Sequence, residues 1–321
     1  MNTQPTGGCI SDVPGVHIGH AHSESGHTGV TVLLFESGAI AGIDIGGSAP
    51  ATRETELLNP TNMIMRIHAI LLTGGSTFGL GAAAGVQRFL QEKDIGFRAS
   101  TGVVVPIVPT AAIFDLDVGR PRIYPDAQMG YDACRNAKAK PTRQGSIGAG
   151  SGALCGKVLG TPTAMRGGVG TASITFPDGL TIGALAVCNA WGDVLDPDTG
   201  SIVAGARDPD APERFLNTDD YLIKRREIDP RFFGRDTTLC VVATNAKFSR
   251  EQITKLAMMA QDGIARAVRP SHTMFDGDVV FAVSLGDKEV DVNVAGSIAA
   301  RMIVEAINRG VREANKVEPT K

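Results

Sequence analysis

The stretch RDTTLCVVATNA, residues 235–246, decides the fold of this chain. Between Trp191 and Arg235 the chain turns polar, with DPDTG, DPDAPE and DPR, and is expected to be a surface excursion. A β-rich apolar run begins at Thr237. An apolar run of this length after a polar segment predicts a buried strand. Its first residue carries a hydroxyl group, as an N-terminal nucleophile requires, because cleavage before that residue would give it a free α-amine as its base. The alternative is a threonine that merely starts a strand.

Downstream of this strand the sequence predicts a helix, a second strand and a long helix. Ser249 and Gln252 form a capping box, after which apolar residues keep helical spacing. The run VVFAVSL, residues 279–285, predicts a strand that lies beside the first one, and a helix is expected over residues 292–314.

Upstream, two pairs of β-rich runs predict hairpins. TASITF (171–176) and LTIGALAVCNA (180–190) flank Asp178-Gly179, which is a strong hairpin turn. VTVLLF (30–35) and IAGIDI (40–45) flank the short glycine-bearing segment ESGA, and we interpret this pair in the same way.

The remaining apolar segments complete a layered fold. AILLT (69–73) predicts a buried strand that leads into a Gly- and Ala-rich helix over 78–92, whereas VVVPIVPTAAIFDL (103–116) carries two prolines and is expected at an edge or an irregular crossing. Strands that come in hairpins and helices that come in long separate blocks favour an α+β fold over a βαβ alternation. No linker is visible, so we expect one domain over residues 1–321.

Composition excludes several classes of protein. The 321 residues are 43% apolar and 20% charged, which excludes a disordered chain. The 31 basic and 34 acidic residues are intermixed, so nucleic acid is not an expected partner. No apolar window is long enough to span a membrane, and the N-terminus lacks the basic and apolar regions of a signal peptide. Five scattered cysteines without a CxxC pattern are expected as small buried residues of a cytoplasmic protein.

Motifs for metals and nucleotides are absent or incomplete. His17, His20, His22 and His27 lie close together in the sequence, but HExxH is absent, and we favour a surface loop over a metal site. The Gly-rich stretch GSIGAGSGALCGK (145–157) does not complete a phosphate-binding pattern, and no GxSxG is present. We therefore expect no metal and no cofactor.

Three other features could carry chemistry or be structural. Asn189 ends an apolar strand, where its amide is either a buried structural group or an oxyanion donor. Lys157 closes the Gly-rich loop, a setting in which lysine is normally solvated. Asp276-Gly277-Asp278 precedes a strand and could bind a metal, orient a nucleophile or cap a turn.

Ten segments in order resemble one family over nearly the whole chain. They are VPGVHIGHA, TGVTVLLF, GGSAPATRETELLNP, HAILLTGGSTFGL, VPIVPTAAIFDL, PDAQMGYDAC, GSIGAGSGALCGK, IGALAVCNAWGDV, TTLCVVATNA and HTMFDGDVVFAV. They resemble the self-cleaving L-aminopeptidase/D-esterase family, which includes β-aminopeptidases and nylon-oligomer hydrolases. The resemblance implies a four-layer αββα sandwich similar to N-terminal-nucleophile hydrolases but with different strand connectivity. It also implies a precursor that cuts itself into residues 1–236 and 237–321, and a homotetramer or larger assembly.

The resemblance also implies roles for individual residues. The family's nucleophile corresponds to Thr237, its oxyanion-donating amide to Asn189 and an active-site lysine of the nylon hydrolases to Lys157. The carboxylates that hold the amine and the hydroxyl of the nucleophile in that branch correspond to Asp276 and Asp278.

Two positions depart from the family pattern. Asp236 precedes the expected nucleophile where many members have Asn or Gly, which affects the expected rate of self-cleavage at Asp236-Thr237. Phe114 stands where some members have Tyr, which removes a hydroxyl donor and alters which substrates fit.

The function expected from the sequence is hydrolysis of small peptides or amides by an N-terminal threonine, in the manner of an aminopeptidase. Endo-type hydrolysis of ω-amino acid oligomers is the enzymatic alternative. The non-enzymatic alternatives are an inactive, uncleaved binding protein on the same fold and a metal-binding protein that uses the four histidines.

Overall fold

Strand β16 (Thr237–Ala246) lies in the centre of a sheet, as its apolar run predicts. It pairs antiparallel with β11 (Thr181–Asn189) and parallel with β18 (Val279–Lys288). Leu239 faces one side of the sheet and Cys240 the other, and both are fully buried. Burial on both faces explains why the run contains apolar residues at successive positions.

The computed structural model describes most of the chain. The described residues are 8–25, 27–120, 122–140, 142–228 and 236–316. Arg235 and the DPR segment at 229–231, which belong to the polar segment before β16, lie outside these ranges.

Strand β2 (Thr28–Ile45) connects the two halves of the sheet and corrects one sequence prediction. The runs at 30–35 and 40–45 do not form a hairpin but continue as one strand of 18 residues. The first half pairs with β1 (His17–Ser23) and β4 (Ile67–Thr73), and the second half pairs with β18. Gly38, at φ 72°, lies in the irregular part between the halves, where the chain bends from one set of partners to the other without reversing.

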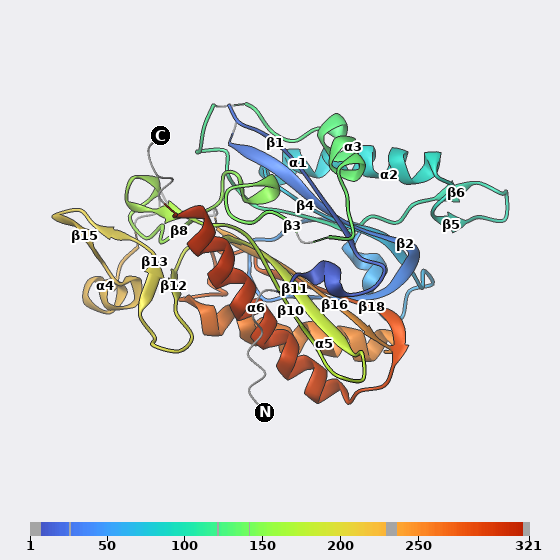
Figure 1. The fold of residues 1–321 in the computed structure, drawn as a ribbon. Helices are drawn as coiled ribbons and strands as arrows, with labels where there is room; N and C mark the ends of the chain where they lie inside the picture. Colours follow the sequence, from blue (N-terminus) through green and yellow to red (C-terminus); the bar gives the residue numbers. More distant parts are fainter. Residues whose placement is uncertain (1–7, 26, 121, 141, 229–235, 317–321) are drawn as a thin grey trace.

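The large sheet folds into two layers, and two pairs of helices cover their outer faces (Figure 1). Helices α5 (Arg250–Ala267) and α6 (Val292–Ala314) pack on the β11–β16–β18 side. Helices α2 (Ala83–Glu92) and α3 (Ala127–Arg135) pack on β2 and β4. A third apolar core lies between the two sheet layers and is formed by both. The predicted αββα four-layer sandwich is confirmed.

The strand order is β10-β11-β16-β18-β2-β4-β7-β3, with β1 beside β2. Further strands are β3 (Ala51–Arg53), β5 (Phe97–Arg98), β6 (Val104–Val105), β7 (Thr110–Ala112), β8 (Leu154–Cys155), β9 (Met165–Arg166), β10 (Gly168–Thr175) and β17 (Val268–Arg269). One short helix, α1 (Ser76–Gly79), precedes α2, and single 3-10 turns lie at Ile10–Asp12, Thr55–Leu58, Leu80–Ala82, Gly148–Gly150 and Thr161–Thr163.

Several local predictions are confirmed. Strands β10 and β11 form the predicted hairpin around Asp178-Gly179, with Gly179 at φ 83°. Ser249 and Gln252 form the capping box of α5. All five cysteines are free and buried. Among the described residues, no helix combines the length and the apolar character that a membrane span requires.

The segment after β11 is less exposed than its composition indicates. It forms β12 (Asp193–Leu195), β13 (Ile202–Ala204), β14 (Arg207–Asp208), β15 (Ala211–Phe215) and α4 (Thr218–Arg225), which project from one side of the sandwich (Figure 1). The predicted surface excursion from Trp191 is wrong at its start, because Trp191 and Asp193 are buried. The Asp193 carboxylate accepts the backbone N–H groups of Ala206 (2.9 Å) and Thr218 (2.7 Å) and so joins this segment to the core.

Candidate active site

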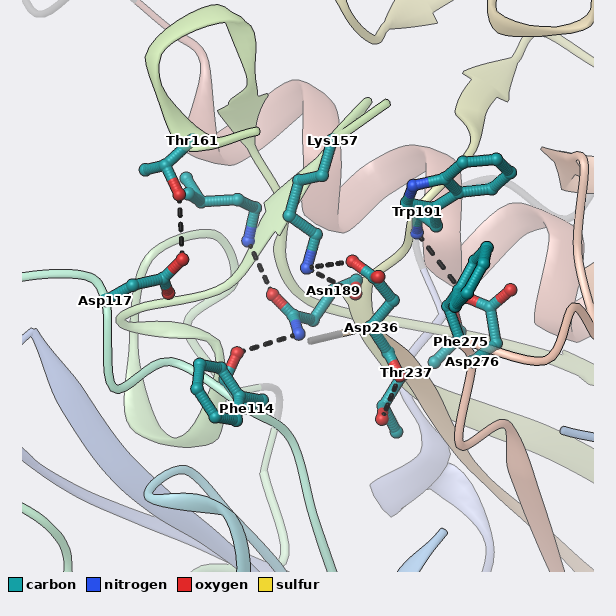
Figure 2. A network of polar contacts seen from close by, with 12 residues as sticks. Phe114, Asp117, Lys157, Thr161, Asn189, Trp191, Asp236, Thr237, Phe275 and Asp276 are labelled. Atoms are coloured by element: carbon teal, nitrogen blue, oxygen red, sulfur yellow. Dashed lines mark hydrogen bonds and ion pairs between the residues drawn. The ribbon is translucent and has the colours of Figure 1, made fainter. Parts of the chain in front are cut away.

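Thr237 and the peptide bond before it lie in a buried site at the start of β16. The Thr237 hydroxyl donates a hydrogen bond to the carbonyl oxygen of Asp236 (Figure 2). The same carbonyl oxygen accepts the backbone N–H of Gly277 at 2.8 Å. A Cβ atom at Gly277 would lie 2.8 Å from Thr237 Oγ1 and 2.6 Å from the carbonyl oxygen of Ala49, so glycine permits this close approach. The carbonyl next to the hydroxyl is thus polarised by two donors.

Lys157 is buried in this site, not solvated as its loop setting alone indicates. Its Nζ lies 2.8 Å from Asp236 Oδ1 and donates to the carbonyl oxygen of Asn189 at 3.0 Å. The loop before it depends on Gly156, at φ 72°, where a Cβ would lie 2.0 Å from the backbone nitrogen of Ala206. Burial raises the pKa of Asp236 above its ordinary value even though the positive charge of Lys157 opposes this effect.

Asn189 faces Thr237 across the β11–β16 pair. Its Oδ1 accepts the backbone N–H of Leu154 at 3.0 Å, and its Nδ2 donates to the carbonyl oxygen of Phe114 at 3.1 Å. These two contacts fix the orientation of the amide, so that its nitrogen faces Phe114. Phe114 accepts this hydrogen bond with its main-chain carbonyl oxygen.

Asp276 and Asp278 lie on the other side of Thr237, in the loop that leads into β18. Asp276 accepts the backbone N–H and the hydroxyl of Thr273 at 3.0 and 2.6 Å, and its Oδ1 lies 3.4 Å from the backbone nitrogen of Trp191. Asp278 Oδ1 accepts the backbone N–H of Thr238 at 2.7 Å. Burial, followed by the charge of Asp278, raises the pKa of Asp276 to about 7.

The structure brings together the residues that the sequence singled out and adds two others. Thr237 shares the site with Lys157, Asn189, Asp236, Phe114 and Asp276 (Figure 2). Asp278 joins them through its hydrogen bond with the backbone of Thr238. The additions are Gly277, which donates to the Asp236 carbonyl, and His272, whose ring contacts Asp278. His272 lies in the segment HTMFDGDVVFAV, but no spacing rule distinguishes it there.

The four N-terminal histidines do not meet at one point. His20 has both ring nitrogens beside threonine hydroxyls, Thr31 at 2.9 Å and Thr142 at 2.6 Å. Burial, followed by the charges of His22 and Arg143, lowers its pKa to about 4. Within the described ranges, no group of three or more His, Cys, Asp or Glu side chains is placed to hold a metal ion.

A cavity of about 730 Å³ lies elsewhere, over α5 and α6, and contains none of the residues around Thr237. The site around Thr237 is marked by its chemical arrangement: a hydroxyl beside a polarised carbonyl, a buried cation and three buried carboxylates. Such a group can support acyl transfer to the hydroxyl.

Because Lys157 and Asp236 are both buried, the loss of Lys157 alone should destabilise the chain. We expect Lys157→Ala to lower the free energy of unfolding by about 3–5 kcal/mol, because it leaves a buried carboxylate without its cation. The additional change Asp236→Asn should recover most of this loss. A buried carboxyl with a raised pKa favours folding at low pH, so the loss should be larger at pH 8 than at pH 5.

Urea unfolding of the four proteins of this double-mutant cycle measures the coupling. All four carry Thr237→Ala, which is chosen to prevent the self-cleavage expected from the sequence. Additive losses from the two single changes would contradict an interaction between Lys157 and Asp236.

Known proteins resemble this chain over most of its length. A family model described as peptidase family S58 matches residues 8–321. An uncharacterized aminopeptidase of Mycobacterium leprae is 40% identical, over 92% of this chain and 84% of that protein. A 6-aminohexanoate-oligomer endohydrolase of an Agromyces species is 33% identical, over 93% of this chain and 81% of that protein.

One solved structure with a similar fold is the L-aminopeptidase D-Ala-esterase/amidase of Ochrobactrum anthropi, described as a variant of the Ntn hydrolase fold. The two structures superpose with a TM-score of 0.67 at 19% identity, over 95% of this chain and 85% of that one. This likeness concerns the fold.

Proposed function

Because this chain belongs to peptidase family S58, we propose that it is a self-processing amide hydrolase whose nucleophile is Thr237. Membership confirms the resemblance found in the sequence and makes the chain a hydrolase of amide bonds. The nucleophile, the self-cleavage and the substrate class are our proposal. In it, a single domain is cut into residues 1–236 and 237–321, and the two parts stay together as one active unit.

Self-cleavage would begin when Thr237 Oγ attacks the carbonyl carbon of Asp236. The bond from that carbon to the nitrogen of Thr237 breaks, the nitrogen takes up the proton of the hydroxyl, and an ester joins Asp236 to Thr237 Oγ. Water then hydrolyses the ester, which leaves a new carboxylate on Asp236 and a free α-amine and hydroxyl on Thr237.

The observation that carries this proposal is the contact between the Thr237 hydroxyl and the carbonyl oxygen of Asp236, in a buried site where Gly277 N–H donates to the same oxygen. The oxygen becomes negative when the carbonyl is attacked, and a backbone donor already aimed at it stabilises that charge. These two contacts support the proposal because they hold the hydroxyl next to the carbonyl group that it would attack.

In turnover, the freed Thr237 would use its α-amine as the base and its Oγ as the nucleophile on a substrate carbonyl. Asn189 would help to stabilise the oxyanion, and Lys157 would favour the neutral amine and the developing negative charge. Asp276 and Asp278 would anchor the amine and the hydroxyl. We also propose, from the family resemblance, a homotetramer or larger assembly. From the five scattered cysteines without a CxxC pattern, we propose that it acts in the cytoplasm.

Blocking the amine of the substrate tests the substrate class. We expect amino-acid p-nitroanilides to be hydrolysed in the presence of a chelator, and N-acetylation of the same substrates to suppress turnover. The free amine gives an aminopeptidase a charged group to bind, and its removal leaves the matching polar groups of the site unpaired. Release of p-nitroaniline from each pair of substrates measures the effect.

Equal rates on the free and the blocked substrate would instead favour endo-type hydrolysis of ω-amino acid oligomers, the reaction named for the Agromyces relative. Loss of activity with chelator would favour a metal-dependent reaction. No hydrolysis of any amide would favour an inactive binding protein.

A further inference from the structure

His272 is a histidine beside the site for which the proposed reaction has no role. It lies in the loop between β17 and β18, at φ 55°, and its side chain is 25% exposed. Its backbone N–H donates to Asp278 Oδ2 at 3.1 Å, and its ring Nδ1 lies 2.9 Å from the same oxygen. One carboxylate oxygen is thus held twice by a single residue.

The other oxygen of Asp278 connects this pair to the strand of the nucleophile. Oδ1 accepts the backbone N–H of Thr238 at 2.7 Å, and Thr238 directly follows Thr237. A carboxylate that is fixed on one side by His272 therefore fixes the peptide after the nucleophile on its other side. Rotation of the Asp278 side chain would break this contact with β16.

The imidazole ring is itself held in place. It forms a hydrogen bond with the backbone of Gln261 in α5, and a Cβ atom at Gly46 would lie 3.0 Å from Nδ1. The charged groups that face the ring are Asp278 and Asp276, whereas Gln261 and Gly46 are uncharged. The hydrogen bond with Asp278 raises the pKa of His272, so the site favours an imidazolium beside the carboxylate.

We propose that His272 is a positioning residue: it fixes the side chain of Asp278, so that Asp278 holds Thr238 and, through it, Thr237. This inference rests on the proposed function, because it assigns His272 a task in that reaction. Because His272 contacts Asp278, we expect loss of the His272 ring to lower kcat more than it raises KM. A nucleophile that leaves its near-attack geometry reacts more slowly without a weaker binding of substrate.

Two substitutions at His272 distinguish the effect of its ring N–H donor from the effect of its backbone conformation. Glycine accepts φ 55° without strain but has no ring, whereas asparagine also accepts this conformation and carries an amide N–H near the position of Nδ1. His27→Gly is a matched control, because His27 also has a positive φ, 45°, and lies in the turn before β2.

Hydrolysis of an amino-acid p-nitroanilide by the purified variants measures the effect. We expect His272→Gly to lower kcat about tenfold with KM within about twofold of wild type, as for the loss of an orienting hydrogen bond. His272→Asn should keep at least about one third of the wild-type kcat, and His27→Gly should match wild type.

Wild-type kcat in His272→Gly would overturn the inference, because the ring would then be dispensable. An equally slow His272→Asn would also overturn it, because the donor would then not be the cause. A wild-type chain that neither cuts itself nor hydrolyses the anilide would overturn the proposed function as well, so the two failures are distinguishable.

Discussion

Thr237→Ala is expected to stay a single 321-residue chain and to lose amide hydrolysis by at least about 10³-fold, since no other group replaces the nucleophile. Alanine removes only the hydroxyl and one methyl group. The packing of β16 between β11 and β18 should therefore be kept, and the melting temperature should change little. Rates of p-nitroanilide release and the pattern of fragments on a denaturing gel measure the two effects.

Thr237→Ser is the matched control, because serine keeps the Oγ nucleophile. It should still cut itself and still hydrolyse the substrate, although its less restricted side chain should make both steps slower. Turnover by Thr237→Ala near the wild-type rate would show that another group attacks the substrate.

Asp276→Asn and Asp278→Asn are each expected to lower turnover by a factor of the order of 10², comparable with the loss of a positioned acid–base group. A newly freed Thr237 has an amine and a hydroxyl that both need fixed partners, and the two carboxylates lie in the loop beside it. Asparagine preserves the size and most of the turn propensity of aspartate while it removes the charge. A catalytic role therefore predicts loss of turnover without a matching loss of melting temperature.

The pKa of about 7 for Asp276 adds a prediction about pH. If its carboxylate form takes part in the reaction, the rate of self-cleavage should rise as pH rises through about 7, and Asp276→Asn should lose this dependence. The same raised pKa means that ionisation of Asp276 costs folding free energy, so its contribution to stability should decline from about pH 4 to above pH 7.

Asp193→Asn is the matched control for these two changes. Asp193 is also a buried carboxylate that accepts two backbone N–H groups, but its contacts join the β12 segment to the core. Its substitution should lower the melting temperature and keep turnover within about threefold of wild type. Near-normal turnover in both Asp276→Asn and Asp278→Asn would remove the pair from the active site.

Local patterns in the sequence predicted the elements whose neighbours are close in the chain. The β10–β11 hairpin and the start of α5 follow from a turn and a cap that span only a few residues. Strand β2 was predicted wrongly, because two apolar runs around a glycine can form a hairpin or one long bent strand. The choice depends on β4 and β18, which lie far apart in the sequence.

The active site shows the same difference between features set by nearby residues and features set by residues far away in the sequence. Lys157 looks solvated in its own loop and becomes a buried cation through Asp236, which belongs to a distant part of the chain. Local patterns singled out Thr237, Asn189 and the Asp276–Asp278 pair but left structural alternatives open, and the family resemblance assigned their expected roles. His272 and Gly277 contribute a ring contact and a backbone donor that no sequence pattern specifies.

The intact mass of purified wild-type protein, measured over a long incubation, tests the central claim most directly. We predict two species, residues 1–236 and 237–321, which copurify because β16 begins the small fragment and pairs along its length with β11 of the large one. The fragment that begins at Thr237 should appear in step with amide hydrolysis. A wild-type chain that stays a single 321-residue species while it hydrolyses amides would contradict the account.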